Sequence, residues 1–142
     1  MATEPRGIDS VEIGQTVYVS KTVGESDVYL FAGITGDLHP NHVNEQYMKD
    51  TRFGRRIAHG ALMVGYISAA STKLLASVSS PCVNYGFERI RFIKPVFIGD
   101  TITVEYRIVE KNPEKDTVYA QVTITNQKGE VVTSAVNLLR FV

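Results

Sequence analysis

GALMVGYISAASTKLLASV, residues 60–78, is the stretch from which the architecture of this chain follows. Its large apolar side chains recur at helical spacing, and no charged residue interrupts it before Lys73. Three small residues, Ala69, Ala70 and Ser71, leave room for a sheet to approach closely. A helix that is apolar nearly all round must be covered nearly all round. The stretch therefore predicts a long, buried central helix over residues 60–78.

The chain that follows this helix has the pattern of β-strands. Strands are predicted over residues 84–94, 101–109, 118–124 and 131–141, with turns over residues 96–100, 111–116 and 126–129. Strict alternation is clearest where one face would carry Ile102, Val104, Tyr106 and Ile108, and again where it would carry Val118, Ala120, Val122 and Ile124. These faces predict the inner side of an antiparallel sheet.

The chain that precedes the helix is more mixed. Residues 11–23 predict a first strand, and Thr22 with Glu25 has the form of a capping box for a short helix over residues 26–35. Gly36 would end that helix. The histidine-bearing segment after it is expected to form a structured loop, and residues 44–49 one or two helical turns.

One helix and a run of antiparallel strands are most economically arranged as an α+β fold, in which a curved sheet wraps around the helix. No repeat, low-complexity segment or second domain is evident, so we expect one domain over residues 1–142. A single sheet of this kind leaves exposed edges. Pairing with a second copy commonly covers them, which predicts a homodimer or a higher homo-oligomer.

Composition excludes several classes of partner. Lys plus Arg equals Asp plus Glu at 15 each, so no net field attracts nucleic acid or an anionic membrane. The longest charge-free apolar stretch, residues 60–72, is too short to cross a bilayer. The first six residues lack the pattern of a signal peptide, and the single cysteine, Cys82, suits a reducing compartment. We expect a cytoplasmic protein that binds neither nucleic acid nor membrane.

Every histidine of the chain lies between His39 and His59, and Asp37 stands just ahead of them. Asp37 and His42 are five residues apart, and Pro40 stiffens the bend between them. A carboxyl and an imidazole that flank one water make an acid–base pair near neutral pH. The alternative is a capped helix end, in which Asp37 accepts hydrogen bonds from local backbone N–H groups. The residues alone leave both open.

Gly60 opens the central helix, where the first N–H groups have no partner inside the helix. A glycine lets a ligand oxygen approach such an N–H closely, as in an oxyanion hole, or it simply marks a turn into the helix. Ser68, two turns further along, either orients Asp37 or bonds its own helix backbone. His59 beside Gly60 is expected to be structural more than catalytic.

Two further groups of residues could in principle bind a metal or a phosphate. Asp37, His39, His42 and His59 offer enough donors for a two-His, one-carboxylate iron site or a zinc site, yet their spacing matches no metal signature and no cysteine assists, so no metal is expected. Arg89, Arg91 and Lys94 form a small cationic group on one strand. They would contact the phosphates of a carrier such as coenzyme A, or merely line a solvated strand face.

Three segments together resemble one known family. FAGITGDLHPNH, residues 31–42, resembles the hydratase motif of the MaoC-like, (R)-specific enoyl-CoA hydratases. FGRRIAHGAL, residues 53–62, is similar to the part of that family that leads into its central helix. RFIKPVFIGD, residues 91–100, is similar to its later strand and turn. The match runs in order over roughly the whole chain, and the first motif is quite specific.

The resemblance implies a hot-dog fold, used as a homodimer, and reversible addition of water across a trans-2-enoyl thioester to give an (R)-3-hydroxyacyl thioester. Asp37 and His42 match the family's catalytic pair. Gly60 matches the N–H that holds the thioester oxygen, and Ser68 the serine that supports the aspartate. The implied partner is an acyl-CoA or an acyl-carrier-protein thioester, and no cofactor is implied beyond the coenzyme A of the substrate.

The chain departs from the family pattern at His39, where the family often has Asn before the proline. The change leaves Asp37 and His42 intact and would tune the site by adding a titrating group. Two rival functions fit the same fold. A hot-dog thioesterase normally places a carboxylate on or near the central helix, whereas no Asp or Glu occurs between Gly60 and Val83. The other rival is a non-catalytic acyl-thioester-binding subunit, against which the intact Asp37 and His42 argue.

Overall fold

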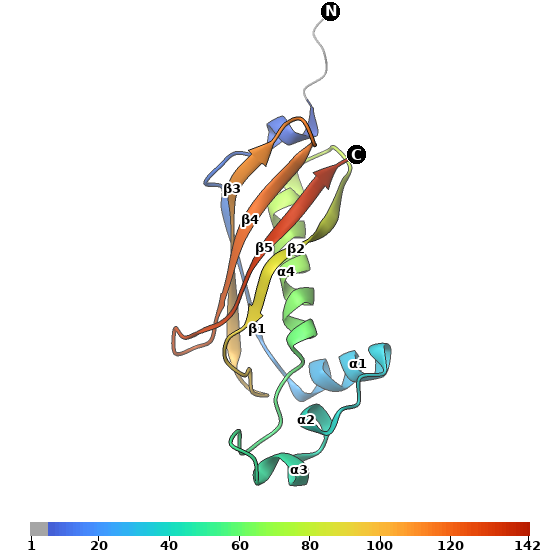
Figure 1. Ribbon diagram of the computed structural model, residues 1–142, viewed down its shortest axis with the longest axis vertical. Helices are drawn as coiled ribbons and strands as arrows, with labels where there is room; N and C mark the ends of the chain where they lie inside the picture. Colours follow the sequence, from blue (N-terminus) through green and yellow to red (C-terminus); the bar gives the residue numbers. More distant parts are fainter. Residues whose placement is uncertain (1–5) are drawn as a thin grey trace, which may run out of the picture.

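The structure, a computed structural model, describes residues 6–142 as a five-stranded antiparallel sheet with one long helix against it (Figure 1). The strand order is β1-β3-β4-β5-β2, so β1 and β2 are the two edges. The strands are β1 (Thr16–Thr22), β2 (Cys82–Phe92), β3 (Thr101–Asn112), β4 (Thr117–Thr125) and β5 (Val131–Phe141). The long helix is α4 (Gly60–Leu74). The α+β prediction is confirmed.

The core lies between the inner face of the sheet and one side of α4. The side chains predicted from alternation to face inward on β3 and β4 are all fully buried, as listed by strand: Ile102, Val104, Tyr106 and Ile108; Val118, Ala120, Val122 and Ile124. From α4, Met63, Ile67, Ala70 and Leu74 meet this face at the three- and four-residue spacing of one helix side. Burial of this apolar area is the main force that holds sheet and helix together.

The central helix differs from its prediction in two ways. It ends at Leu74 and continues only as a short 3-10 turn, η2 (Leu75–Ser77). It is also not covered all round, because the sheet shields only one side of it within a single chain. The uncovered side carries small residues, namely Ala61, Gly65, Ser68, Ala69 and Thr72. That part of the prediction is wrong for the single chain.

The first strand begins five residues later than predicted. Residues 7–10 form a 3-10 turn, η1 (Gly7–Ser10). Val11 is a fully buried core residue and does not belong to a strand. Gly14 interrupts the β pattern because its φ of +92° is a conformation that other residues rarely adopt. The chain turns there, and β1 starts at Thr16.

The predicted capping box is also wrong. Thr22 is the last residue of β1, and its hydroxyl bonds that of Thr101 on β3. The helix α1 (Glu25–Thr35) begins after Gly24, whose N–H donates to the Asp27 carboxylate at 2.8 Å. The prediction for the other end is confirmed, because Gly36 ends α1 in the left-handed conformation at φ +79°.

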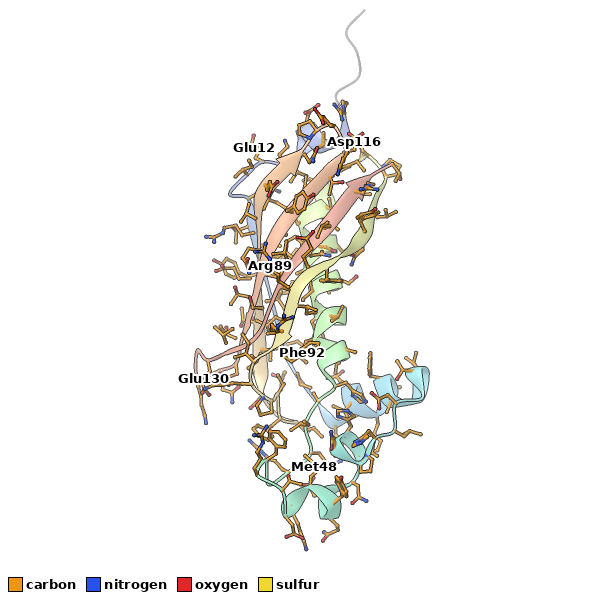
Figure 2. The ribbon with its side chains drawn as sticks, in the orientation of Figure 1. Glu12, Met48, Arg89, Phe92, Asp116 and Glu130 are labelled. Atoms are coloured by element: carbon orange, nitrogen blue, oxygen red, sulfur yellow. The ribbon has the colours of Figure 1, made fainter. Side chains whose placement is uncertain are left out.

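Residues 25–59 lie beyond one end of the sheet and are called the overhanging segment (Figure 1). The segment contains α1 and two short helices, α2 (Pro40–Val43) and α3 (Glu45–Lys49). Met48 of α3 marks it in Figure 2. The histidine stretch was expected to be a loop, yet it includes α2, because Pro40 suits the first position of a helix and the His39 ring caps it by accepting the Asn41 N–H.

A half-buried arginine joins the helices of the overhanging segment. The Arg56 side chain, 17% exposed, forms ion pairs with Glu25 of α1 and Glu45 of α3 and donates to the Tyr29 hydroxyl. These carboxylates raise the pKa of Arg56, so it remains charged.

Among residues 6–142, no helix has both the length and the apolar character needed to cross a membrane. The expectation that no signal peptide is present concerns mainly residues 1–5, which lie outside the described residues.

Candidate active site

Asp37, His42 and His59 converge where the overhanging segment meets the start of α4. One potential ligand atom from each lies within 4.8 Å of the others. The three come from different places in the fold: Asp37 follows α1, His42 is in α2, and His59 immediately precedes α4. The proximity of Asp37 and His42, expected from their spacing, is therefore present in the structure. The proximity alone does not assign them a role.

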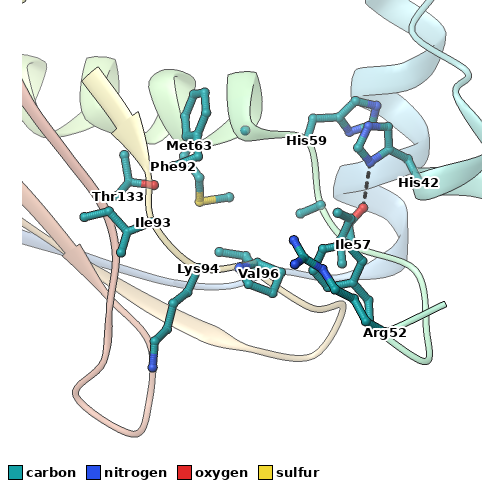
Figure 3. Close-up of a pocket in the computed structure, with 14 residues that line it drawn as sticks. His42, Arg52, Ile57, His59, Met63, Phe92, Ile93, Lys94, Val96 and Thr133 are labelled. Atoms are coloured by element: carbon teal, nitrogen blue, oxygen red, sulfur yellow. Dashed lines mark hydrogen bonds between the residues drawn. The ribbon is translucent and has the colours of Figure 1, made fainter. Parts of the chain in front are cut away.

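His42 is buried and held in one orientation by the backbone. Its Nδ1–H donates to the Ile57 carbonyl oxygen at 2.7 Å, as the dashed line in Figure 3 shows. The proton on Nδ1 leaves Nε2 with a free lone pair, which is the form that a general base requires. Burial lowers the pKa of His42, and the Ile57 carbonyl opposes this only in part. A neutral imidazole is thus favoured at neutral pH.

Asp37 is exposed and sits in the turn after Gly36. Its Oδ1 accepts the backbone N–H of His39 at 3.3 Å. This local bond is the structural alternative that the sequence left open, and it coexists with the approach of the carboxylate to His42. The second carboxylate oxygen remains available to a ligand, because the bond to His39 uses only Oδ1.

His59 is only 2% exposed and contacts both other members of the cluster. Its Nε2–H donates to the Asp37 backbone oxygen at 3.0 Å. Its ring stacks on that of His42 with centroids 3.7 Å apart and planes 25° apart (Figure 3). The Phe31 ring lies 4.7 Å away on a tilted plane. The remaining nitrogen, Nδ1, is buried without a hydrogen-bond partner among the described residues.

Gly60 is the first residue of α4, so its N–H has no partner inside the helix. The helix dipole adds positive potential at this point. A side chain could not replace the glycine hydrogen without movement, because a Cβ there would lie 2.8 Å from the Phe92 ring. Because Gly60 has no side chain, the Phe92 ring can lie directly against it.

A cavity of about 260 Å³ is lined by His42, His59 and Gly60, whereas Asp37 is not among its lining residues. Its walls are mainly apolar, with Met63 from α4, Phe92 at the end of β2 and Val96 from the following loop (Figure 3). Arg52 and Lys94 bring positive charge to its lining. An apolar cavity with a few convergent polar groups has the character of a small-molecule site.

The potential donor atoms of Asp37, His42 and His59 are close enough to bind a metal ion, but the two imidazole rings are badly oriented for it. Metal–nitrogen bonds of about 2.0–2.1 Å lie in the imidazole plane. His42 and His59 are stacked, with planes only 25° apart, so their in-plane lone pairs do not converge on one ion. A ligand pair would require at least one ring to turn and break its bond to Ile57 or to Asp37.

Three of the predicted site residues lie elsewhere in the single chain. Ser68 is exposed on α4, and among the described residues no hydrogen bond joins it to Asp37. Arg89 and Arg91 do not line the cavity, and Arg89 lies further along the sheet than Phe92 (Figure 2). The Arg91 guanidinium bonds the carbonyl of its neighbour Ile90. The expected orientation of Asp37 by Ser68 is therefore not made within one chain.

Lys94 and His39 fare differently. Lys94 lines the cavity and also pairs with Glu130 of the β4–β5 turn (Figure 2). His39 is exposed and its ring centroid is 6.4 Å from that of His42, close enough to influence the pair electrostatically without belonging to it.

Sequence reasoning missed two contributions to the site. Ile57 acts through its backbone, because its carbonyl sets the His42 tautomer and its N–H donates to Asn41 at 3.0 Å. No side-chain signal could reveal such a role. Phe92 lies against Gly60. The only available signal for it was a large apolar residue at the end of an edge strand, followed within three residues by Pro95.

Comparison with known proteins finds the same family over most of the chain. A model of the MaoC-like domain matches residues 9–130. The (R)-specific enoyl-CoA hydratase of Rhodospirillum rubrum is 41% identical over 124 residues, which cover 87% of this chain and 83% of that protein. The 3-hydroxybutyryl-CoA dehydratase of Methylorubrum extorquens is 38% identical over 107 residues, 75% of this chain and 66% of that protein.

Solved structures agree with the fold. The (R)-hydratase from A. caviae superposes with a TM-score of 0.84 at 27% identity, and the superposition covers 92% of this chain and 97% of that one. The sheet wrapped around one long helix is therefore the hot-dog arrangement expected from the sequence motifs.

Proposed function

This chain belongs to the MaoC-like dehydratase family, and on that premise we propose that it is a hydro-lyase acting on enoyl thioesters. It adds water across a trans-2-enoyl-CoA to give the (R)-3-hydroxyacyl-CoA, or removes water in the reverse direction. The relatives named (R)-specific enoyl-CoA hydratase and 3-hydroxybutyryl-CoA dehydratase carry out the two directions that their names state. The substrate is therefore an acyl-CoA.

In the proposed hydration, His42 and Asp37 divide the proton transfers. A water bound between them attacks C3 while Nε2 of His42 takes one of its protons. The π electrons of the C2–C3 bond move toward the thioester oxygen, which gains negative charge. His42 passes this proton to the Asp37 carboxylate, and the transiently protonated Asp37 delivers it to C2, so both side chains return to their starting state. The reverse sequence expels water.

Gly60 supports the step that carries the most charge. Its N–H at the start of α4 stabilises the enolate-like oxygen that forms between attack and protonation. Removal of one such donor typically lowers turnover about 10²–10³-fold. The apolar cavity beside Gly60 holds the acyl part, and Lys94 with Arg52 contacts the phosphates of coenzyme A. No other cofactor takes part.

One observation carries the proposal most directly. A ring nitrogen of the neutral, oriented His42 lies within 4.8 Å of an Asp37 carboxylate oxygen, close to a helix start whose N–H has no partner inside the helix. This combination brings a base and an acid close together, with an oxyanion donor at the cavity that His42 and Gly60 line. Burial lowers the pKa of His42, which favours the neutral form that a general base requires.

The enzyme is further proposed to be a homodimer. β2 is an edge strand that presents large apolar side chains to solvent, with Val83 46%, Tyr85 55% and Phe92 53% exposed. A second copy paired along this edge covers them and brings a second α4 against the uncovered small-residue side of the first. Ser68 lies on that side and would meet substrate or the partner there. Sedimentation should give a dimer mass, and a monomer at micromolar concentration would contradict this assembly.

The function is tested with crotonyl-CoA and longer enoyl-CoAs by following the loss of enoyl absorbance while free thiol is measured in parallel. The wild type should hydrate the substrate without releasing CoA. Asp37→Asn and His42→Ala should lose about 10²–10⁴-fold of the rate. Glu110→Gln, which changes an exposed carboxylate on β3, is the matched control and should keep full activity. Equal rates in all four proteins, or thiol release without hydration, would overturn the proposal.

A further inference from the structure

His59 is a buried imidazole to which the proposed mechanism gives no proton transfer. It nevertheless touches each of the groups that the mechanism uses. Its Nε2–H bonds the Asp37 backbone, its ring stacks on His42, and it is the residue immediately before Gly60. The acid, the base and the oxyanion donor come from three separate elements, and this side chain is the point at which they meet.

The hydrogen bonding of His59 is incomplete in a way that needs explanation. A ring nitrogen that faces a carbonyl oxygen must carry the proton, so Nε2 is the donor and Nδ1 holds a lone pair. Nδ1 is buried with no partner among the described residues, which costs free energy. A phenyl ring of similar size would avoid this cost and keep the stack. The imidazole is therefore explained by its one bond, to Asp37.

That bond is the tie between the Asp37 turn and the start of α4. Asp37 is exposed, and its N–H makes only a 3.2 Å bond to the Thr35 hydroxyl within the same turn. Without the bond from His59, the backbone of Asp37 would form hydrogen bonds only within its own turn, among the residues that the structure describes. A shift of about 1 Å in a reacting group can cost about 10²-fold in rate. The stacked ring of His42 would keep its place through Ile57 while the carboxyl moved.

We propose that His59 is a positioning residue, which holds the Asp37 carboxyl in register with His42 and Gly60 through its bond to the Asp37 backbone and its stack on the His42 ring. It transfers no proton itself. The inference rests on the proposed function for its effect on rate, but the bond and its loss can be observed without turnover.

Two variants separate the parts of this role. His59→Phe keeps an aromatic ring and removes the donor, and His59→Gln keeps a donor of similar reach and removes the ring. We expect His59→Phe to lose at least about tenfold in kcat with KM changed less than about twofold, while resistance to denaturant is unchanged or higher. His59→Gln should retain more kcat than His59→Phe. A merely structural histidine would lower stability and activity together.

The matched control is Tyr106→Phe. This change also removes one hydrogen bond from a buried ring, the 2.7 Å bond from the Tyr106 hydroxyl to Asn137. Tyr106, however, lies in the sheet and not at the site. Its stability should fall and its kcat should stay at the wild-type value. A His59→Phe protein with wild-type kcat, a His59→Gln protein no better than it, or a loss of kcat explained by loss of folded protein would each overturn the inference.

Hydrogen–deuterium exchange gives the readout that does not depend on turnover. Backbone N–H groups of residues 36–39 should exchange at least about tenfold faster in His59→Phe and at the wild-type rate in Tyr106→Phe. Unchanged exchange in His59→Phe would overturn the positioning role. If the wild type failed to hydrate enoyl-CoA, the proposed function would fail while this measurement still decided whether His59 holds the turn.

Discussion

The sheet with α4 and the overhanging segment are stabilised by different kinds of contact. The first is held by a continuous apolar cluster that includes Ile67, in which α4 packs mainly against β1 and β3. The second depends on polar contacts: Arg56 pairs with Glu25 and Glu45, and a backbone carbonyl fixes each of His42 and His59. Apolar packing tolerates small adjustments, whereas a hydrogen-bonded site is lost when one partner moves. Substitutions in the core should therefore mainly lower stability, whereas substitutions in the overhanging segment should mainly lower kcat.

The largest expected effect on stability comes from the core. Ile67→Ala removes a fully buried side chain from α4 and should lower the free energy of unfolding by about 2–5 kcal/mol. The kcat of the protein that remains folded should change less than about twofold, because the overhanging segment makes its own contacts. Chemical denaturation at fixed protein concentration measures the first quantity and enoyl-CoA hydration the second. A large fall in kcat with little change in stability would contradict the division between the regions.

Arg56→Met should show the opposite balance. Its partners are substantially exposed, so the loss of stability should be modest, about 1 kcal/mol. The adjacent Ile57 carbonyl would lose its support and release the His42 ring, which should reduce kcat about tenfold. Arg56→Lys keeps the charge but not the planar, forked geometry of the guanidinium, so its kcat should lie between those of the wild type and Arg56→Met.

Arg107→Met serves as the control for Arg56→Met, since Arg107 is exposed on β3 and forms no ion pair among the described residues. Both its stability and its kcat should match the wild type. If Arg56→Met left kcat unchanged, the ion pairs of Arg56 would not be needed to keep the site in its active arrangement.

The pH dependence of kcat/KM is a finer test of the site. His42 acts as a base only when neutral, so activity should be full above its pKa and lost as the pH falls through it. Burial lowers that pKa below the ordinary value of about 6.5, with His59 and His39 adding to the effect and Asp37 and the Ile57 carbonyl opposing it. The acidic limb should therefore lie below that value, and an apparent pKa above it would contradict a buried, neutral base.

The smallest expected effect is that of His39→Asn, which restores the residue that the family often has. Asn can cap α2 as the His39 ring does, by accepting the Asn41 N–H. We expect kcat and stability within about twofold and about 0.5 kcal/mol of the wild type. A tenfold change in hydration rate would show that His39 belongs to the catalytic group instead of lying beside it.

The sheet could be predicted well because burial leaves a period of two in the chain. Ile102, Val104 and the residues that alternate with them are buried as expected. Errors arose where one residue overrode the pattern: Gly14 delayed the first strand, and Pro40 started a helix inside a presumed loop. The uncovered side of α4 was also missed, because Ala and Gly fit equally well under a sheet and in the open.

The site could be predicted only in its side chains. Asp37, His42 and Gly60 were visible as residue types that suit acid–base and oxyanion chemistry at plausible spacing. The Ile57 carbonyl, which decides which nitrogen of His42 is free, has no signature in the sequence because every residue carries a carbonyl. The contact of Phe92 with Gly60 joins positions 32 residues apart and depends on how β2 ends.

The central claim is that Asp37 and His42 place the elements of water across one double bond. Hydration of crotonyl-CoA in D₂O, with the product identified by mass spectrometry and chiral chromatography, tests it most directly. We expect (R)-3-hydroxybutyryl-CoA with a single deuterium on C2, formed by the wild type and not by His42→Ala. A product of the opposite configuration, deuterium missing from C2, or free CoA in place of a hydrated thioester would contradict it.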